Sequence, residues 1–288
     1  MTAEPPPGRA RVAPAGPTLE SAVSAGGMSP RKRSAAVRAV LYGLLVILFV
    51  YALFNADWPK LARTFFNPTI AGGMFPDVVF IAAKNTIVYT IVAFAFGLVF
   101  GLLLALMKLS TIGPYRWMAT GYIELLRGLP ALVTLILIAY GIPIAFDINV
   151  PGGQLGTAAL GLGMVAAAYM AETIRAGIQA VPKGQVEAAR SLGMPRAWTM
   201  ISIVIPQAFR IIIPPLTNEL VLLIKDTSLL FVIGTTPISV ELTKFGRDGM
   251  SNNFNSTPLT VIALAYLVVT LPLTQLVAAL ERRQARAR

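Results

Sequence analysis

The sequence contains no cysteine and no histidine. The absence of cysteine excludes a disulfide, and without histidine the chain lacks the commonest ligand for transition metals. It also has no Gly-x-x-x-x-Gly-Lys-Ser/Thr motif, whose backbone would cradle nucleotide phosphates, and no pairing of nucleophile and base. We therefore expect no catalytic residue, no metal site and no bound cofactor in this chain.

Charged residues are scarce as well, since they make up 13% of the 288 residues while 56% are hydrophobic. The mean hydropathy of +0.70 is unusual for a soluble domain. A helix needs roughly 20 apolar residues to cross the hydrocarbon core, and irregular backbone cannot face lipid. The sequence thus predicts an all-α integral membrane protein with six spans, at about 35–54, 85–107, 129–146, 156–172, 214–233 and 258–280.

The net charge of +11 could indicate a nucleic-acid partner, but its distribution favours another explanation. With six spans and an inside N-terminus, 18 of the 24 Lys and Arg fall on the inner side. Cytoplasmic segments of membrane proteins carry such an excess. We therefore expect both termini to be cytoplasmic, and no nucleic-acid partner. The outer segments hold only Lys60, Arg63, Lys84, Lys244 and Arg247.

The chain divides by composition into a tail, an N-terminal helix and a larger transmembrane domain. Pro and Gly are frequent in the first thirty residues, where no apolar periodicity is found. The long polar lead before the first span favours an uncleaved anchor over a secretory signal. We expect a disordered cytoplasmic tail at 1–34, an N-terminal transmembrane helix at 35–54, an outside linker at 55–83, a transmembrane domain at 84–281 and a cytoplasmic tail at 282–288.

The loop after the fourth span carries a specific pattern: Glu-Ala-Ala, three residues, Gly, nine residues, Ile, and then Pro three residues later. This pattern resembles the EAA loop of ABC importer permeases, with Ile205 in place of the usual Leu. The resemblance implies that 176–206 is a cytoplasmic loop that docks on a separate ATPase subunit. Its helix formers and a central Gly predict two short helices joined by a bend. The coupling residues would be Glu187, Ala188, Ala189, Gly193, Ile203 and Pro206.

The resemblance extends over about 75–283. Outside the loop it points to a more specific group within the ABC importer permeases. Further blocks look like those of permeases for glutamine, glutamate, histidine and arginine; they lie at 122–130, 169–178, 181–185, 206–210, 214–219 and 225–229. This implies a five-helix type I core plus one N-terminal helix in a bacterial plasma membrane. The implied partners are ABC ATPase subunits, an extracytoplasmic substrate-binding protein and a second permease, identical or similar. ATP hydrolysis would belong to the separate ATPase chain.

Several charges fall at membrane depth and allow more than one interpretation. Charge near the bilayer centre costs at least ~2.5 kcal/mol on insertion scales, so such residues face a partner or a watery cavity. They could line the path of a polar amino acid, which brings both an ammonium and a carboxylate, or they could form a network between helices. The charged residues are Glu219, Lys225 and Asp226, and the hydroxyl residues Thr227 and Ser228 follow them in the same possible substrate path.

Two further acid–base pairs lie near cytoplasmic helix ends. Glu124 with Arg127, and Glu172 with Arg175, are spaced three residues apart and can pair on one helix face. Such pairs would fix helix ends or take part in gating.

An ion-coupled secondary transporter or channel is the alternative function. Secondary carriers typically show internal repeats and several midplane charges. This chain shows no convincing repeat and only one such cluster, and the EAA spacing has no purpose in that class.

Overall fold

The computed structural model describes residues 30–286, which contain helices and connecting segments but no strand. The chain forms two compact units, Met1–Trp58 and Pro59–Arg288. The described part of the first unit is mainly α2, Pro30–Asn55, which includes an apolar span at Arg33–Asn55. The helix therefore begins within the segment that we assigned to the tail, so residues 30–34 are helical. The rest of the predicted tail, 1–29, lies outside the described residues.

The expected linker at 55–83 is largely helical. It contains α3 (Trp58–Phe65), α4 (Pro68–Gly73) and the π-helix η1 (Val78–Ala83), which runs directly into α5 (Lys84–Leu109). The second span therefore begins at Val78 and covers 32 residues. Lys84, next to the predicted start of this span, does not interrupt the helix, because a long cationic side chain near a membrane surface can reach water.

The next span is broken rather than straight. It consists of α6 (Gly113–Gly128), followed by α7 (Ala131–Ile136), η2 (Leu137–Gly141) and α8 (Ile142–Phe146). The two arms meet at 107°. Pro130 explains the break, because proline disfavours helical angles in the residue before it. The described residues thus contain five helices able to span a membrane, or six if the bent pair counts as one.

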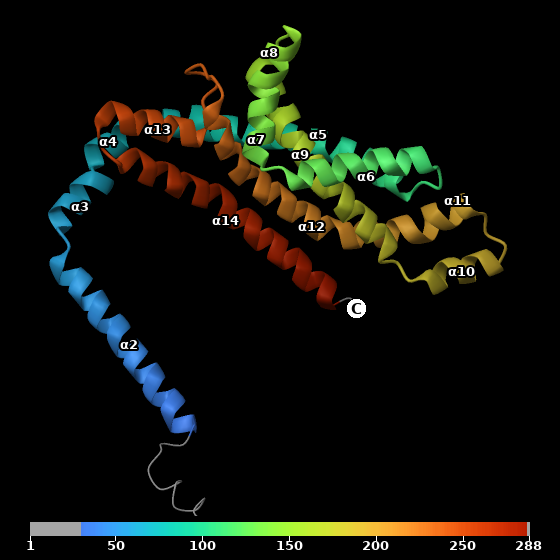
Figure 1. Cartoon of the computed structure of the whole chain (residues 1–288), viewed down its shortest axis with the longest axis horizontal. Coiled ribbons are helices and arrows are strands. Elements are labelled where there is room, and N and C mark those ends of the chain that lie inside the picture. The colour runs from blue at the N-terminus through green and yellow to red at the C-terminus, as the bar shows by residue number, and fades with distance from the viewer. Residues whose placement is uncertain (1–29, 287–288) are drawn as a thin grey trace, which may run out of the picture. The chain divides into compact units, whose positions relative to one another are not determined.

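The remaining helices complete an all-α fold, as the sequence predicted (Figure 1). They are α9 (Gly153–Gln179), α10 (Lys183–Ser191), α11 (Arg196–Thr199), η3 (Met200–Val204), α12 (Ile205–Asp226), η4 (Thr227–Val232), α13 (Leu242–Asn253) and α14 (Thr257–Arg286).

Helix α9 forms the centre of the second unit, where it packs against α5, α6, α7 and α12. The most extensive packing is with α5, where glycines in α5 let the two helices approach closely. A Cβ added to Gly101 would lie 2.9 Å from the Cβ of Met170, and one added to Gly97 would lie 3.0 Å from the Cβ of Ala166. Small residues allow such close helix contact in membranes.

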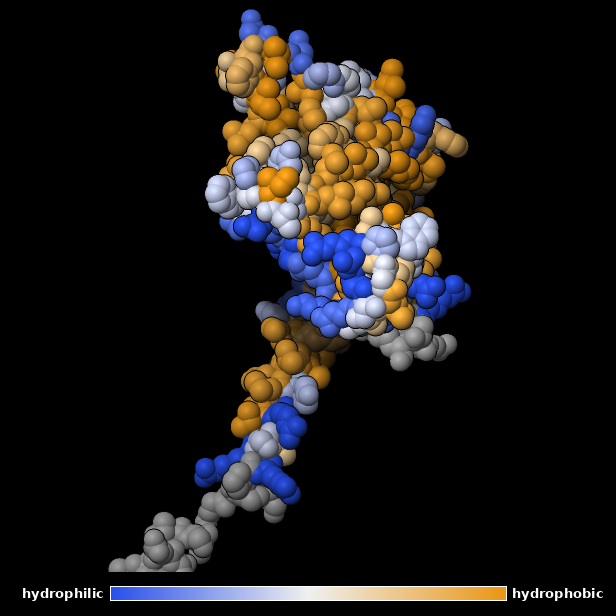
Figure 2. Space-filling view, turned by 90° about the vertical axis from the view of Figure 1, so that its right-hand side faces the viewer, coloured by the Kyte–Doolittle hydropathy of each residue, from blue (hydrophilic) through white to orange (hydrophobic). Residues whose placement is uncertain are grey.

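The outer surface of the second unit is rich in apolar side chains, as a lipid-exposed surface should be. Phe80 and Val268 are 70% and 73% exposed. Figure 2 shows a broad apolar face, with hydrophilic residues gathered along its lower edge in that view.

Candidate functional site

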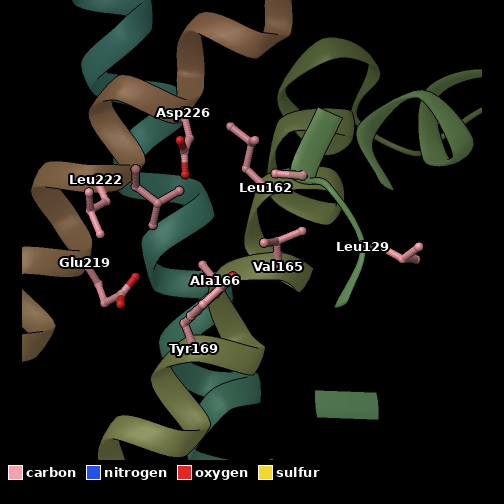
Figure 3. Close-up of a pocket in the computed structure, with 10 residues that line it drawn as sticks. Leu129, Leu162, Val165, Ala166, Tyr169, Glu219, Leu222 and Asp226 are labelled. Carbon is pink, nitrogen blue, oxygen red and sulfur yellow. The ribbon is translucent and has the colours of Figure 1, made fainter. Parts of the chain in front are cut away.

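A cavity of about 280 Å³ lies between α9, α12 and the break that follows α6. Its wall is mostly apolar, with two carboxylates and one phenol. Figure 3 shows both carboxylates on the side of α12 that faces α9. The lining residues are Leu129, Ala131, Leu162, Val165, Ala166, Tyr169, Glu219, Leu222, Leu223 and Asp226.

Helix geometry explains which predicted residues meet in this cavity. Glu219 and Asp226 are two helical turns apart, so they share one face of α12 at a spacing of about 10 Å. Lys225 directly precedes Asp226 and so lies on another face of the helix. It is exposed and does not line the cavity. Thr227 is buried and donates a hydrogen bond to the carbonyl of Ile224 at 2.6 Å. The predicted set is thus divided, with only the two carboxylates on the cavity wall.

A cation lies beside the cavity although it was not predicted there. The guanidinium carbon of Arg127 lies 5.3 Å from the ring centroid of Tyr169, a cation–π arrangement. The predicted ion pair between Arg127 and Glu124 is therefore wrong, and within residues 30–286 no ion pair joins the two. The aromatic face on α9 binds the guanidinium instead. The sequence spacing could not reveal this contact, because it joins two helices.

The second predicted ion pair, between Glu172 and Arg175, is confirmed, and a third residue joins it. Arg175 Nη2 lies 2.7 Å from Glu172 Oε2 on α9. Lys108, in the last turn of α5, forms an ion pair with the other carboxylate oxygen of Glu172. The acid thus links the ends of α5 and α9 as well as neighbouring turns of one helix.

The bend predicted at Gly193 is confirmed. Gly193 has φ of +84°, the left-handed region that glycine adopts without steric cost. Its N–H donates to the carbonyl of Arg190 at 3.0 Å, and that of Met194 donates to the carbonyl of Ala189 at 3.1 Å. These two bonds form a Schellman motif, which ends α10 and satisfies its last carbonyl groups.

The second arm of the EAA loop is not a short helix, contrary to prediction. From Arg196 the chain runs through α11, η3 and α12 as one apolar span to Val232. Ile203 and Pro206 therefore lie inside a continuous helix. The chain tolerates Pro206 there because it directly follows the π turn of η3, where the hydrogen-bond ladder changes register. The other boundary also shifts, since α9 continues to Gln179, so the predicted loop 176–206 is too wide.

The three residues of the EAA pattern in the first arm differ in exposure. Glu187 and Ala188 are exposed, whereas Ala189 is only 3% exposed. In the described part of the chain no ion pair joins Glu187 to Arg190, which was one predicted role for the acid. Arg190 instead donates to the carbonyl of Met194 at 2.8 Å and so supports the bend.

One buried acid was not predicted at all. Glu241 is fully buried and accepts hydrogen bonds from the N–H groups of Thr243 and Lys244, at 2.6 and 2.7 Å, at the start of α13. The Tyr266 hydroxyl donates to it at 3.3 Å. Burial raises the pKa of Glu241 to about 7. Glu is not a favoured N-cap residue, so no pattern in the sequence indicated this role.

Residues 97–286 match the family described as binding-protein-dependent transport system inner membrane component. The chain belongs to this family. It is 36% identical over 205 residues to the probable glutamine ABC transporter permease protein GlnM of Bacillus subtilis, covering 69% of this chain and 89% of that one. It is also 36% identical over 210 residues to the glutamate/aspartate import permease protein GltK of Escherichia coli O157:H7, covering 69% and 90%.

Solved structures agree with this assignment. A crystal structure of an amino acid ABC transporter with histidines matches with a TM-score of 0.64 at 36% identity, covering 80% of this chain and 99% of that one. An inward-facing methionine ABC transporter, at 18% identity and a TM-score of 0.56, shares the fold. The protein is thus a multi-pass membrane permease of an ABC importer, whose ATP hydrolysis takes place on a separate subunit. This sets aside the ion-coupled alternative.

Proposed function

We propose that this chain carries a polar amino acid, glutamine, glutamate or a similar one, into the cell across the bacterial plasma membrane. The main observation behind this proposal is the cavity between α9, α12 and the break after α6. The names of the relatives, which include glutamine, arginine and glutamate permeases, support the same class of substrate.

The cavity's chemistry suits a zwitterion in a water-poor site. Once dehydrated, the ammonium of an amino acid needs negative partners, and Glu219 and Asp226 provide them. Its carboxylate needs a cation, and Arg127 lies against Tyr169 on the cavity wall. Two carboxylates also favour a neutral or basic side chain over an acidic one, because like charges repel. Within the proposed class, we therefore favour glutamine or a basic amino acid over glutamate.

The proposed assembly follows from the family. An extracytoplasmic binding protein delivers the substrate, and ATPase subunits bind the EAA loop through Glu187, Ala188, Ala189 and Gly193. Ile203 and Pro206 then act within the helix that continues from the loop. A second permease, identical or similar, completes the path next to the cavity. The excess of Lys and Arg on one side supports cytoplasmic termini, with η1 to α14 forming the transport core.

Uptake of a panel of labelled amino acids in a deletion strain tests the substrate and the cavity together. Glu219→Gln and Asp226→Asn should each raise the KM for uptake about tenfold or more, because an ion pair to the ammonium is lost. Asp147→Asn is the matched control: it removes an exposed carboxylate at a left-handed position that Asn tolerates.

The abundance of the assembled complex separates binding from packing. If the carboxylates only hold helices together, both substitutions should lower abundance without a specific change in KM. Normal uptake by both variants at normal abundance would contradict the proposed substrate site.

A further inference from the structure

A groove of about 810 Å³ lies on the apolar surface of the second unit, between η1 with the start of α5 on one side and the first half of α14 on the other. Helix α14 packs against α4 and η1 beside this groove. With one exception, the side chains that line the groove are apolar. They include Phe75, Ile87 and Val88 on one wall and Leu264, Val268 and Val269 on the other.

The exception is Lys84, the first residue of α5. It is exposed, and within residues 30–286 it forms no ion pair. None of the described residues that line the groove is acidic, so its net charge is positive. A lysine lays its alkyl chain along apolar surface and keeps its ammonium toward water. An apolar groove with an unpaired ammonium therefore matches a molecule that has an apolar chain and a negative head.

The length of the groove distinguishes a lipid chain from a helix of another protein. Its lining on α14 extends from Val261 to Val269, about 12 Å at 1.5 Å per residue. The hydrocarbon core is about 30 Å thick, so the groove is no deeper than one leaflet, and any tilt of α14 only reduces this depth. An acyl chain occupies one leaflet, whereas a spanning helix needs a surface more than twice as long. Helix α2 also contains no acidic residue that could pair with Lys84.

We propose that the groove binds an anionic phospholipid from the leaflet that contains the start of α5. One acyl chain lies between α5 and α14, and the phosphate forms an ion pair with Lys84. The lipid thus fills apolar space between two spans and neutralises a charge near the membrane surface. This inference goes beyond the proposed function, because the site requires neither the substrate nor the ATPase.

Native mass spectrometry of the purified permease complex, in detergent with equal amounts of phosphatidylglycerol and phosphatidylcholine, tests the role of the headgroup. The wild type should retain phosphatidylglycerol in preference to phosphatidylcholine. Lys84→Gln should lower this preference about fivefold, because one lysine near a membrane surface contributes roughly this factor to the binding of anionic lipid. Lys84→Arg should keep the preference, since it keeps the charge. The control is Arg116→Gln, which removes an exposed cation that does not line the groove.

Filling the groove tests the role of the acyl chain. Val268→Trp should lower the binding of both lipids, because the larger side chain takes the space of the acyl chain. Leu276→Trp is the matched control, since Leu276 is an exposed residue of α14 outside the groove. An unchanged lipid preference in Lys84→Gln would overturn the proposal, and so would wild-type lipid binding in Val268→Trp. A Val268→Trp variant that keeps its lipid but loses a second permease would show that a protein helix occupies the groove instead.

Discussion

Carboxylates in this chain lie in three surroundings that give them different roles. Glu219 and Asp226 face a cavity without an ion-pair partner in the described structure. Glu172 is held between two cations at the ends of α5 and α9. Glu241 is buried among backbone N–H groups and a phenol. Burial and charge partners, more than residue type, therefore decide which acid can receive a cation from outside the chain.

Glu241 should make the stability of the permease depend on pH. Burial raises its pKa from 4.5 to about 7, so the folded protein holds the proton more tightly than the unfolded chain. The stabilisation is complete below about pH 4.5 and is lost as the pH rises to about 7. The melting temperature of the purified permease should fall by roughly 5 °C over this range. Lys244 and Asp248, in the helix α13 that Glu241 caps, form an ion pair with each other.

Glu241→Gln is the variant that checks this assignment. Because glutamine does not titrate, the slope of melting temperature against pH should largely disappear, whereas it should persist in Asp147→Asn. A wild-type melting temperature that stays constant between pH 4.5 and 7 would mean that hydrogen bonds outweigh burial at Glu241.

One ion pair within a helix could be predicted from the sequence, whereas the contacts between helices could not. The pair of Glu172 and Arg175 follows from a spacing of three residues. Lys108 joins the same acid from α5, and Arg127 prefers the ring of Tyr169 on α9. Both contacts depend on how the helices pack, which no periodicity in this chain encodes.

At the scale of elements, the bend at Gly193 joins α10 to a helix that reaches the cavity lined by Glu219 and Asp226. The sequence predicted this bend because glycine ends helices cheaply. The prediction of a second short helix was wrong. Pro206 suggests a helix boundary, but the π turn of η3 accommodates this proline within a longer helix. Helix ends were predicted less well than helix centres for the same reason: one Lys or Pro near an end does not stop a helix.

Replacing Gly193 should uncouple the loop from transport. A Cβ at its left-handed angles costs about 1–2 kcal/mol, and a β-branched residue costs more. We therefore expect Gly193→Val to lower uptake at least tenfold while the permease still inserts, with hydrolysis no longer stimulated by the loaded binding protein. Gly184→Val is the matched control, because Gly184 lies on α10 at ordinary helical angles with open space around it. Normal uptake and normally stimulated hydrolysis in Gly193→Val would show that this bend does not couple the two subunits.

At the scale of the whole molecule, a polar loop and a carboxylate-lined cavity are connected by a single long helix. The class of protein could be predicted, because the EAA spacing fixes several residues over twenty positions. The cavity could be predicted only in part, since the 107° break after α6 and the position of Tyr169 arise from packing. The EAA pattern is thus visible in a short stretch of sequence, whereas the cavity depends on how the helices pack.

The source of energy for transport tests the central claim most directly. The permease, its ATPase subunits and any second permease are reconstituted in liposomes, with the binding protein and a labelled amino acid on the outer face. We predict uptake that requires ATP on the cytoplasmic face and the binding protein on the other, and that persists when ionophores collapse the ion gradients. Uptake that proceeds without ATP and stops when the gradients collapse would contradict this account.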